Sequence, residues 1–237
     1  MVWTFIYVGL LCFCSCRQER VEYEKGDVKV CMEQGEEWLH DFPLFLGIKI
    51  KNPPQVAIWL EDTKGNYLST VYATRKIATQ SWLAAGGNRR KEALPHWCHA
   101  RGVIYEDGLY LPTKKEPLTD GISGATPKGS FDVKLSPSST LKQFVVKIEI
   151  NHSTDFNRCY PKSAEEGDAH YSGGKKGSGQ PAVVYGAYVD LSSGQKSFEA
   201  DLIGHSSADG SSGDLSEDLS GLTTALRIVK RITIHVQ

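Results

Sequence analysis

The chain has 237 residues, with 27 Lys and Arg against 28 Asp and Glu, and a formal charge of −1. A nearly neutral chain has no net electrostatic field that would attract nucleic acid, so we exclude nucleic-acid binding. Hydrophobic residues make up 40% of the chain, which excludes wholesale disorder and suits one large β domain or two small domains.

The first sixteen residues, MVWTFIYVGLLCFCSC, are apolar and uncharged. Such a run before a polar segment is typical of a signal peptide, although the usual positive start is missing. The ending Ser15-Cys16 resembles a loose bacterial lipobox. This resemblance implies that Cys16 is acylated and anchors the chain in the bacterial cell envelope, on the periplasmic or extracytoplasmic side. A cleaved signal peptide or a buried strand is the alternative. We assign residues 1–16 to this segment and residues 17–237 to a single domain.

Three cysteines, Cys31, Cys98 and Cys159, follow the apolar segment. An odd number allows one disulfide with one free thiol, or three thiols. There is no CxxC pair, so a thioredoxin-like redox centre is not supported.

Alternating polar and apolar residues predict strands in the first part of the chain. The apolar run QVAIWL at 55–60 favours a central strand, and turn residues join it to a hairpin partner at 67–74. A short helix is predicted around 80–85. Two further strands are predicted at 27–32 and 46–51.

The second part has its clearest alternation from 141 to 151, with Phe144, Val146, Ile148 and Ile150 on one face. The other strands are predicted at 130–135, 181–190, 197–203 and 225–236.

Long loops separate several of these strands. The Gly-rich segment 161–180 predicts an exposed loop, and 214–222 predicts a short helix or an ordered loop. Tyr185 and Tyr188 are three residues apart in one strand, so they should face opposite sides. Together the elements predict an all-β fold, an antiparallel immunoglobulin-like β-sandwich with long Gly-rich loops.

The most informative motif is Asp120-Gly121-Ile122-Ser123-Gly124-Ala125-Thr126. It resembles the D-x-x-[ST]-G-A-T signature of flavinylated proteins, in which an FMN transferase attaches FMN to the threonine. By this resemblance Thr126 carries covalent FMN, and Asp120, Ser123, Gly124 and Ala125 form the recognition loop. Small neighbours would let a phosphate approach the backbone, and Lys128 would neutralise it. A tight turn before a strand is the alternative reading.

A wider pattern combines the segments Val56–Asp62, Pro95-x-Trp97, Asp120–Thr126, Asn151–Ser153 and Tyr160-Pro161. This combination resembles an extracytoplasmic family called domain of unknown function 2271. The resemblance implies a β-sandwich, with an FMN transferase and a membrane redox protein as partners.

Other candidate sites are weaker. His96 and His99 flank Cys98, but a transition metal needs further ligands. The acidic loop from Asp209 to Asp218 has oxygen ligands for Ca²⁺ but lacks EF-hand spacing, so a solvated loop is favoured.

The sequence contains no G-x-S-x-G motif, so a hydrolase is not supported. Because the flavinylation motif is the one motif with a stated chemistry, we expect an electron carrier rather than an enzyme. The alternative is a β-sandwich adaptor without a cofactor, which binds a protein or glycan through its late loops.

Overall fold

A computed structural model describes residues 27–43, 48–80, 82 and 89–237 of this chain. The predicted export segment with Cys16 lies outside the described residues. So does most of the helix predicted around 80–85.

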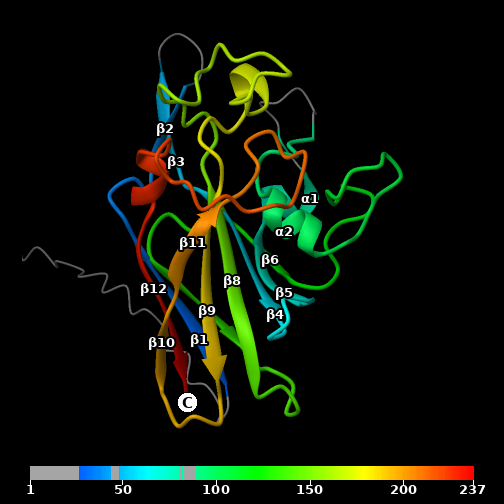
Figure 1. The fold of residues 1–237 in the computed structure, drawn as a ribbon, viewed down its shortest axis with the longest axis vertical. Coiled ribbons are helices and arrows are strands. Elements are labelled where there is room, and N and C mark those ends of the chain that lie inside the picture. Colours follow the sequence, from blue (N-terminus) through cyan, green and yellow to red (C-terminus); the bar gives the residue numbers. More distant parts are fainter. Residues whose placement is uncertain (1–26, 44–47, 81, 83–88) are drawn as a thin grey trace, which may run out of the picture.

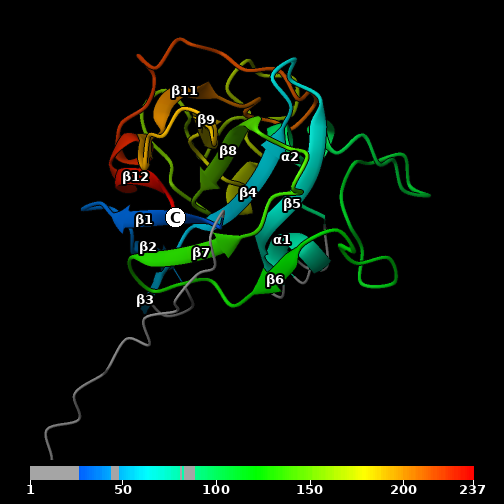
Figure 2. The ribbon, with the colours of Figure 1, turned by 90° about the horizontal axis from the view of Figure 1, so that it is seen from below.

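Two β-sheets pack face to face, which confirms the predicted all-β sandwich (Figures 1 and 2). The first sheet has six strands and the second has four. In order across the first sheet these are β11 (Asp201–His205), β9 (Val183–Asp190), β8 (Gln143–Asn151), β4 (Gln55–Glu61), β5 (Tyr67–Thr74) and β6 (Ile122–Gly124). The second has β10 (Ser197–Glu199), β12 (Val229–Val236), β1 (Val28–Gln34) and β7 (Phe131–Leu135). A separate hairpin joins β2 (His40–Pro43) and β3 (Lys49–Asn52).

The main core lies between the two sheets and contains the residues expected from the alternation in β8. Phe144, Val146, Ile148 and Ile150 are all fully buried there. In β9, Tyr185 is buried and Tyr188 is exposed, as their spacing predicts.

A second core covers the outer face of the six-stranded sheet. Helices α1 (Arg75–Thr79) and α2 (Pro95–Ala100) lie over it, and Trp59 of β4 packs there with Trp97 of α2. Every residue of β4 is buried because both faces of this strand are covered. The central position predicted for QVAIWL is therefore confirmed.

Two predicted elements differ from the structure, and helix α1 was not predicted. That helix occupies Arg75–Thr79 and ends at Gln80, whose φ of 48° is left-handed. The strand predicted at 197–203 is two strands, because the chain passes from one sheet to the other at Ala200. The last strand is preceded by a 3₁₀ turn, η2 (Thr224–Arg227).

The long loops gather at the end of the sandwich opposite the C-terminus (Figure 1). They include 157–180, with the short 3₁₀ turn η1 (Gly174–Lys176), and 206–223. The segment 214–222 is an ordered loop, held by an isolated bridge between His205 and Ser216. No helix within the described ranges is long and apolar enough to cross a membrane.

Candidate functional site

The predicted flavinylation motif lies at a free edge of the six-stranded sheet. Its central residues form β6, which pairs in parallel with Tyr72–Thr74 of β5. This is the one parallel pair among the named strands, because the chain crosses over through α1 and α2 before it returns. Ser123 and Ala125 are exposed, and Thr126 is half-buried. The motif is therefore presented at the surface.

Asp120 fixes the start of the motif through contacts with β5 and with the end of α2. Its carboxylate accepts a hydrogen bond from the Tyr67 hydroxyl, and the Arg101 guanidinium lies 3.5 Å away. Burial, together with the hydrogen bond to Asp120, raises the pKa of Tyr67, so this phenol stays a donor. The carboxylate thus points toward β5 and α2 and orients the loop.

The glycines of the motif are needed for close packing against β5. A Cβ atom at Gly121 would lie 2.7 Å from the Thr70 side chain, and one at Gly124 would lie 3.2 Å from the Tyr72 ring. Both positions therefore favour residues without a side chain.

Thr126 lies between two anchored points of the backbone. The Tyr72 hydroxyl donates to the Ala125 carbonyl at 3.1 Å, and Trp38 Nε1 donates to the Pro127 carbonyl at 3.2 Å. Within the described part of the chain, the Thr126 hydroxyl itself makes no hydrogen bond. The backbone is fixed while the hydroxyl is left available for reaction.

A groove of about 580 Å³ opens beside the motif, between β5 and β7. Its apolar wall includes Leu68, Ile122 and Leu135. Ile122 is 64% exposed and Leu68 is 42% exposed, which is unusual for large apolar side chains at a sheet edge. Of the motif residues, Ile122 lies in the groove wall, so this motif groove offers an apolar surface beside the start of the motif.

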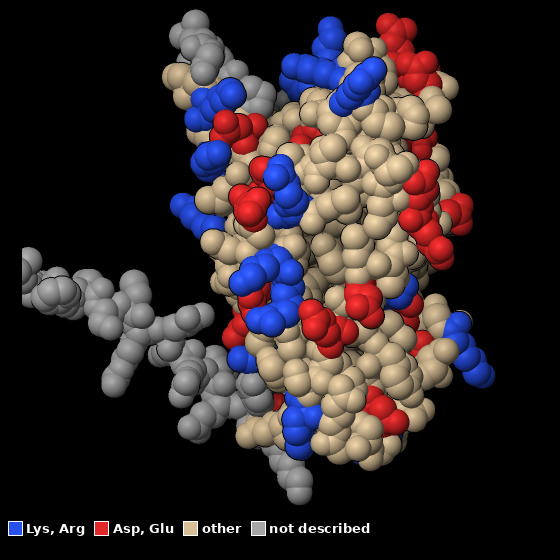
Figure 3. Space-filling view, turned by 60° about the vertical axis from the view of Figure 1, so that its left-hand side comes forward, with Lys and Arg blue, Asp and Glu red and all other residues tan. Residues whose placement is uncertain are grey.

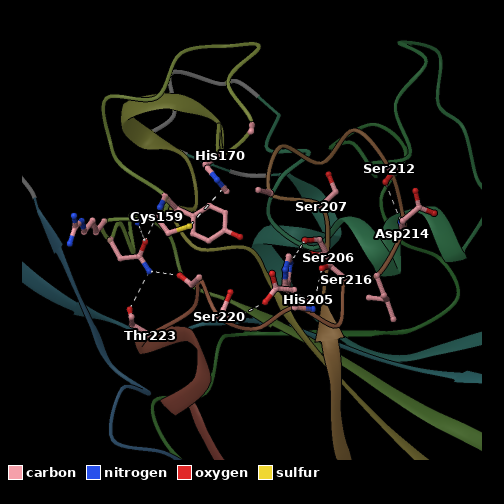
Figure 4. Close-up of a pocket in the computed structure, with 18 residues that line it drawn as sticks. Cys159, His170, His205, Ser206, Ser207, Ser212, Asp214, Ser216, Ser220 and Thr223 are labelled. Carbon is pink, nitrogen blue, oxygen red and sulfur yellow. Dashed lines mark hydrogen bonds between the residues drawn. The ribbon is translucent and has the colours of Figure 1, made fainter.

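The late loops enclose a second, larger cleft of about 830 Å³ (Figure 4). We call it the loop-end cleft. Its walls come from 157–160, 169–170, 205–208 and 212–223. Six of its eighteen lining residues are serine or threonine, so several hydroxyls can bind the polar atoms of a ligand.

Cys159 and His170 face each other across one side of the loop-end cleft (Figure 4). Cys159 Sγ lies 3.9 Å from His170 Nδ1, and the imidazole packs edge-on against the Tyr160 ring. Spacing in the sequence did not reveal this pair, because the ten residues between its members form an irregular loop.

The three cysteines of the domain are all free thiols. Burial raises the pKa of Cys98 far above its ordinary value, and burial with the neighbouring Asp132 raises the pKa of Cys31 to about 11. Both thiols therefore stay protonated at neutral pH. Of the two possibilities left open by the count, the structure has three thiols and no bridge.

The candidate metal ligands have other contacts. His96 Nδ1 lies 2.7 Å from the Gly213 carbonyl, and His99 Nδ1 lies 2.8 Å from the Pro95 carbonyl. The Asp209 carboxylate accepts hydrogen bonds from Ser207 and Ser211. The described residues contain no group of three His, Cys, Asp or Glu side chains with the geometry of a metal site.

Positive and negative side chains are interspersed on the left of the face shown in Figure 3, whereas acidic side chains gather along its upper right edge and much of the middle is uncharged. Ion pairs on the protein surface include Lys51 with Asp41 and Arg231 with Glu33.

Comparison of the chain with models of protein families, with curated proteins and with solved structures found no match. The family resemblance and the flavinylation motif therefore stay predictions from the sequence.

Proposed function

We propose that this chain is an electron-transfer protein of the bacterial cell envelope that carries FMN on Thr126 and is anchored through Cys16. The observation that carries the proposal is the presentation of Thr126. A rigid backbone holds an unbonded hydroxyl at an open sheet edge, within a D-x-x-S-G-A-T motif. An FMN transferase would need this access, because the threonine oxygen must reach a phosphorus atom.

The motif and its surroundings fit FMN in three respects. Gly124 and Ala125 leave the backbone open, and the exposed Lys128 supplies a positive charge for a phosphodiester. The motif groove, with Ile122 in its wall, suits one face of an aromatic ring system. When bound, FMN would supply one- and two-electron chemistry, and the chain would position it for a membrane redox partner.

Replacing Thr126 is the direct test. We expect the chain, co-expressed with an FMN transferase that uses FAD and releases AMP, to gain the mass of one FMN less one water and to fluoresce on a denaturing gel. Thr126→Val removes the hydroxyl but keeps the side-chain shape, so the added mass and fluorescence should vanish. Thr63→Val, at an exposed threonine outside both the motif and the motif groove, is the matched control and should keep both. An unmodified wild-type mass would contradict the flavin proposal.

Acylation of Cys16 is tested separately in a bacterial host. Cys16→Ala should abolish incorporation of labelled fatty acid and release the chain from the membrane fraction, because the acyl chains supply the anchoring free energy. Cys14→Ala is the matched control in the same segment and should stay labelled. Equal labelling of the two variants would rule out Cys16 as the anchor.

A second candidate function is supported by the loop-end cleft. The late loops, in which we expected a binding surface, enclose the larger of the two cavities described above. A β-sandwich adaptor that binds a polar ligand there would need no flavin and would be indifferent to Thr126→Val. The same experiment therefore separates the two candidates.

A further inference from the structure

The Cys159–His170 pair in the loop-end cleft has a geometry that the flavin proposal does not use. A thiol in contact with an imidazole can transfer its proton and become a nucleophile. Cys159 Sγ lies 3.9 Å from His170 Nδ1, a long S···N hydrogen bond that already places the thiol beside a base.

The surrounding backbone holds the thiol in place. Asn157 Oδ1 accepts the backbone N–H groups of Cys159 and Tyr160 at 2.9 and 2.8 Å, and Asn157 Nδ2 donates to the Gly221 carbonyl at 2.9 Å. A Cβ atom at Gly221 would lie 2.9 Å from Cys159 Sγ, so this glycine makes room for the sulfur. These contacts join both walls of the cleft beside Cys159 and keep it half-exposed.

The charges on the cleft wall indicate the kind of ligand. Arg158 is positive, whereas Asp214 and Asp218 are negative and exposed. A small molecule that carries both an ammonium and a carboxylate would pair with both signs, and the hydroxyls would bind its remaining polar atoms. The volume of about 830 Å³ is large enough for such a molecule.

We propose that Cys159 is a thiol–disulfide exchange site for a small zwitterionic disulfide, with His170 as the base. The Cys159 sulfur attacks one sulfur of the ligand, a new S–S bond forms, and the old S–S bond breaks. Cys159 is oxidised to a mixed disulfide and the ligand is reduced to one free thiol. The Cys159 proton passes to His170 Nδ1 and then to the departing thiolate, so protons and electrons balance. A second small thiol reverses the step.

The chain itself provides comparison thiols. Cys31 and Cys98 have raised pKa values because of burial, and each is outside the cleft lining. Within the domain, the mixed disulfide should therefore form at Cys159 and spare the other two.

The test uses the reduced full chain, without flavin, and L-cystine as the probe. Peptide mapping resolves adducts at each cysteine over time. We expect Cys159 to react faster than Cys31 and Cys98, and faster with cystine than with the dication cystamine.

His170→Asn should slow the reaction at Cys159 about tenfold near neutral pH, because a free thiol is only a few per cent thiolate there. The rates of the wild type and of His170→Asn should converge at high pH, where hydroxide can remove the thiol proton without His170.

His235→Asn, on β12 in the other sheet, is the matched control and should leave the rate unchanged. An equal rate at Cys31, an equal rate with cystamine, or an unchanged rate in His170→Asn would each overturn the proposal. Because the readout is an adduct on flavin-free protein, its failure is distinguishable from failure of the flavin proposal.

Discussion

Trp97→Ala is expected to lower the free energy of unfolding by about 3–5 kcal/mol, the usual cost of removing a large buried aromatic side chain. Trp97 is fully buried in the second core, and its Nε1 donates to Thr70 Oγ1 at 3.1 Å. The Arg101 guanidinium lies 5.2 Å from the centre of the Trp97 ring. Denaturant unfolding measures the loss.

The same substitution should loosen the base of the flavinylation motif. Arg101 pairs with Asp120, so loss of the Trp97 ring removes the surface that supports this ion pair. Relative to the wild type, we expect Trp97→Ala to accelerate amide hydrogen exchange more in 120–124 than in β8, which lies at the centre of the sheet.

Tyr188→Ala is the control for Trp97→Ala. Tyr188 is also a large aromatic residue but is 52% exposed, so its loss should change stability by only about 0.5 kcal/mol. A loss below about 1 kcal/mol in Trp97→Ala would contradict a stabilising second core. If Trp97→Ala fails to fold, Trp97→Phe keeps most of the buried ring and should show a smaller loss in the same direction.

Glu149→Gln is expected to change how stability depends on pH. Burial raises the pKa of Glu149 to about 7, although the N–H groups of Trp97 and His96 and the Ser206 hydroxyl favour its charged form. The folded state therefore binds this proton more tightly than the unfolded state. Stability from this group is present at low pH and is lost as the pH rises from about 4.5 to about 7.

Across that window the wild type should lose up to about 3 kcal/mol relative to Glu149→Gln, which has no charge to bury. Unfolding at pH 5 and at pH 8 measures the difference.

Glu61→Gln is the matched control. Glu61 is also buried in the six-stranded sheet, but it accepts a hydrogen bond from Trp59 and pairs with Lys147. An equal stability difference at both pH values for Glu149→Gln would contradict the prediction.

Glu149 also shows why some important residues are hard to predict from sequence. In β8 it alternates with the core residues and should face solvent on an ordinary one-sided sheet. Instead, its carboxylate accepts the N–H groups of His96 and Trp97, 3.2 and 2.7 Å away, at the start of α2. The local pattern carries no sign of this because α2 lies more than 50 positions away in sequence.

The flavinylation motif and the Cys159–His170 pair also differ in how far each could be recognised from the sequence. Asp120–Thr126 is a continuous segment, so it was visible in the sequence, but its placement on a parallel edge strand was not. Cys159 and His170 were visible only as single residues, and folding of the irregular loop brings them together.

The sandwich was predictable from the sequence, because period-two alternation is a local property that places Phe144 and its neighbours on one buried face. The central strand was predictable too, since a continuous apolar run needs cover on both faces. The cover of the outer face, the position of Thr126 and the loops that enclose the cleft were not predictable. These features depend on contacts between distant segments, and no local periodicity encodes them.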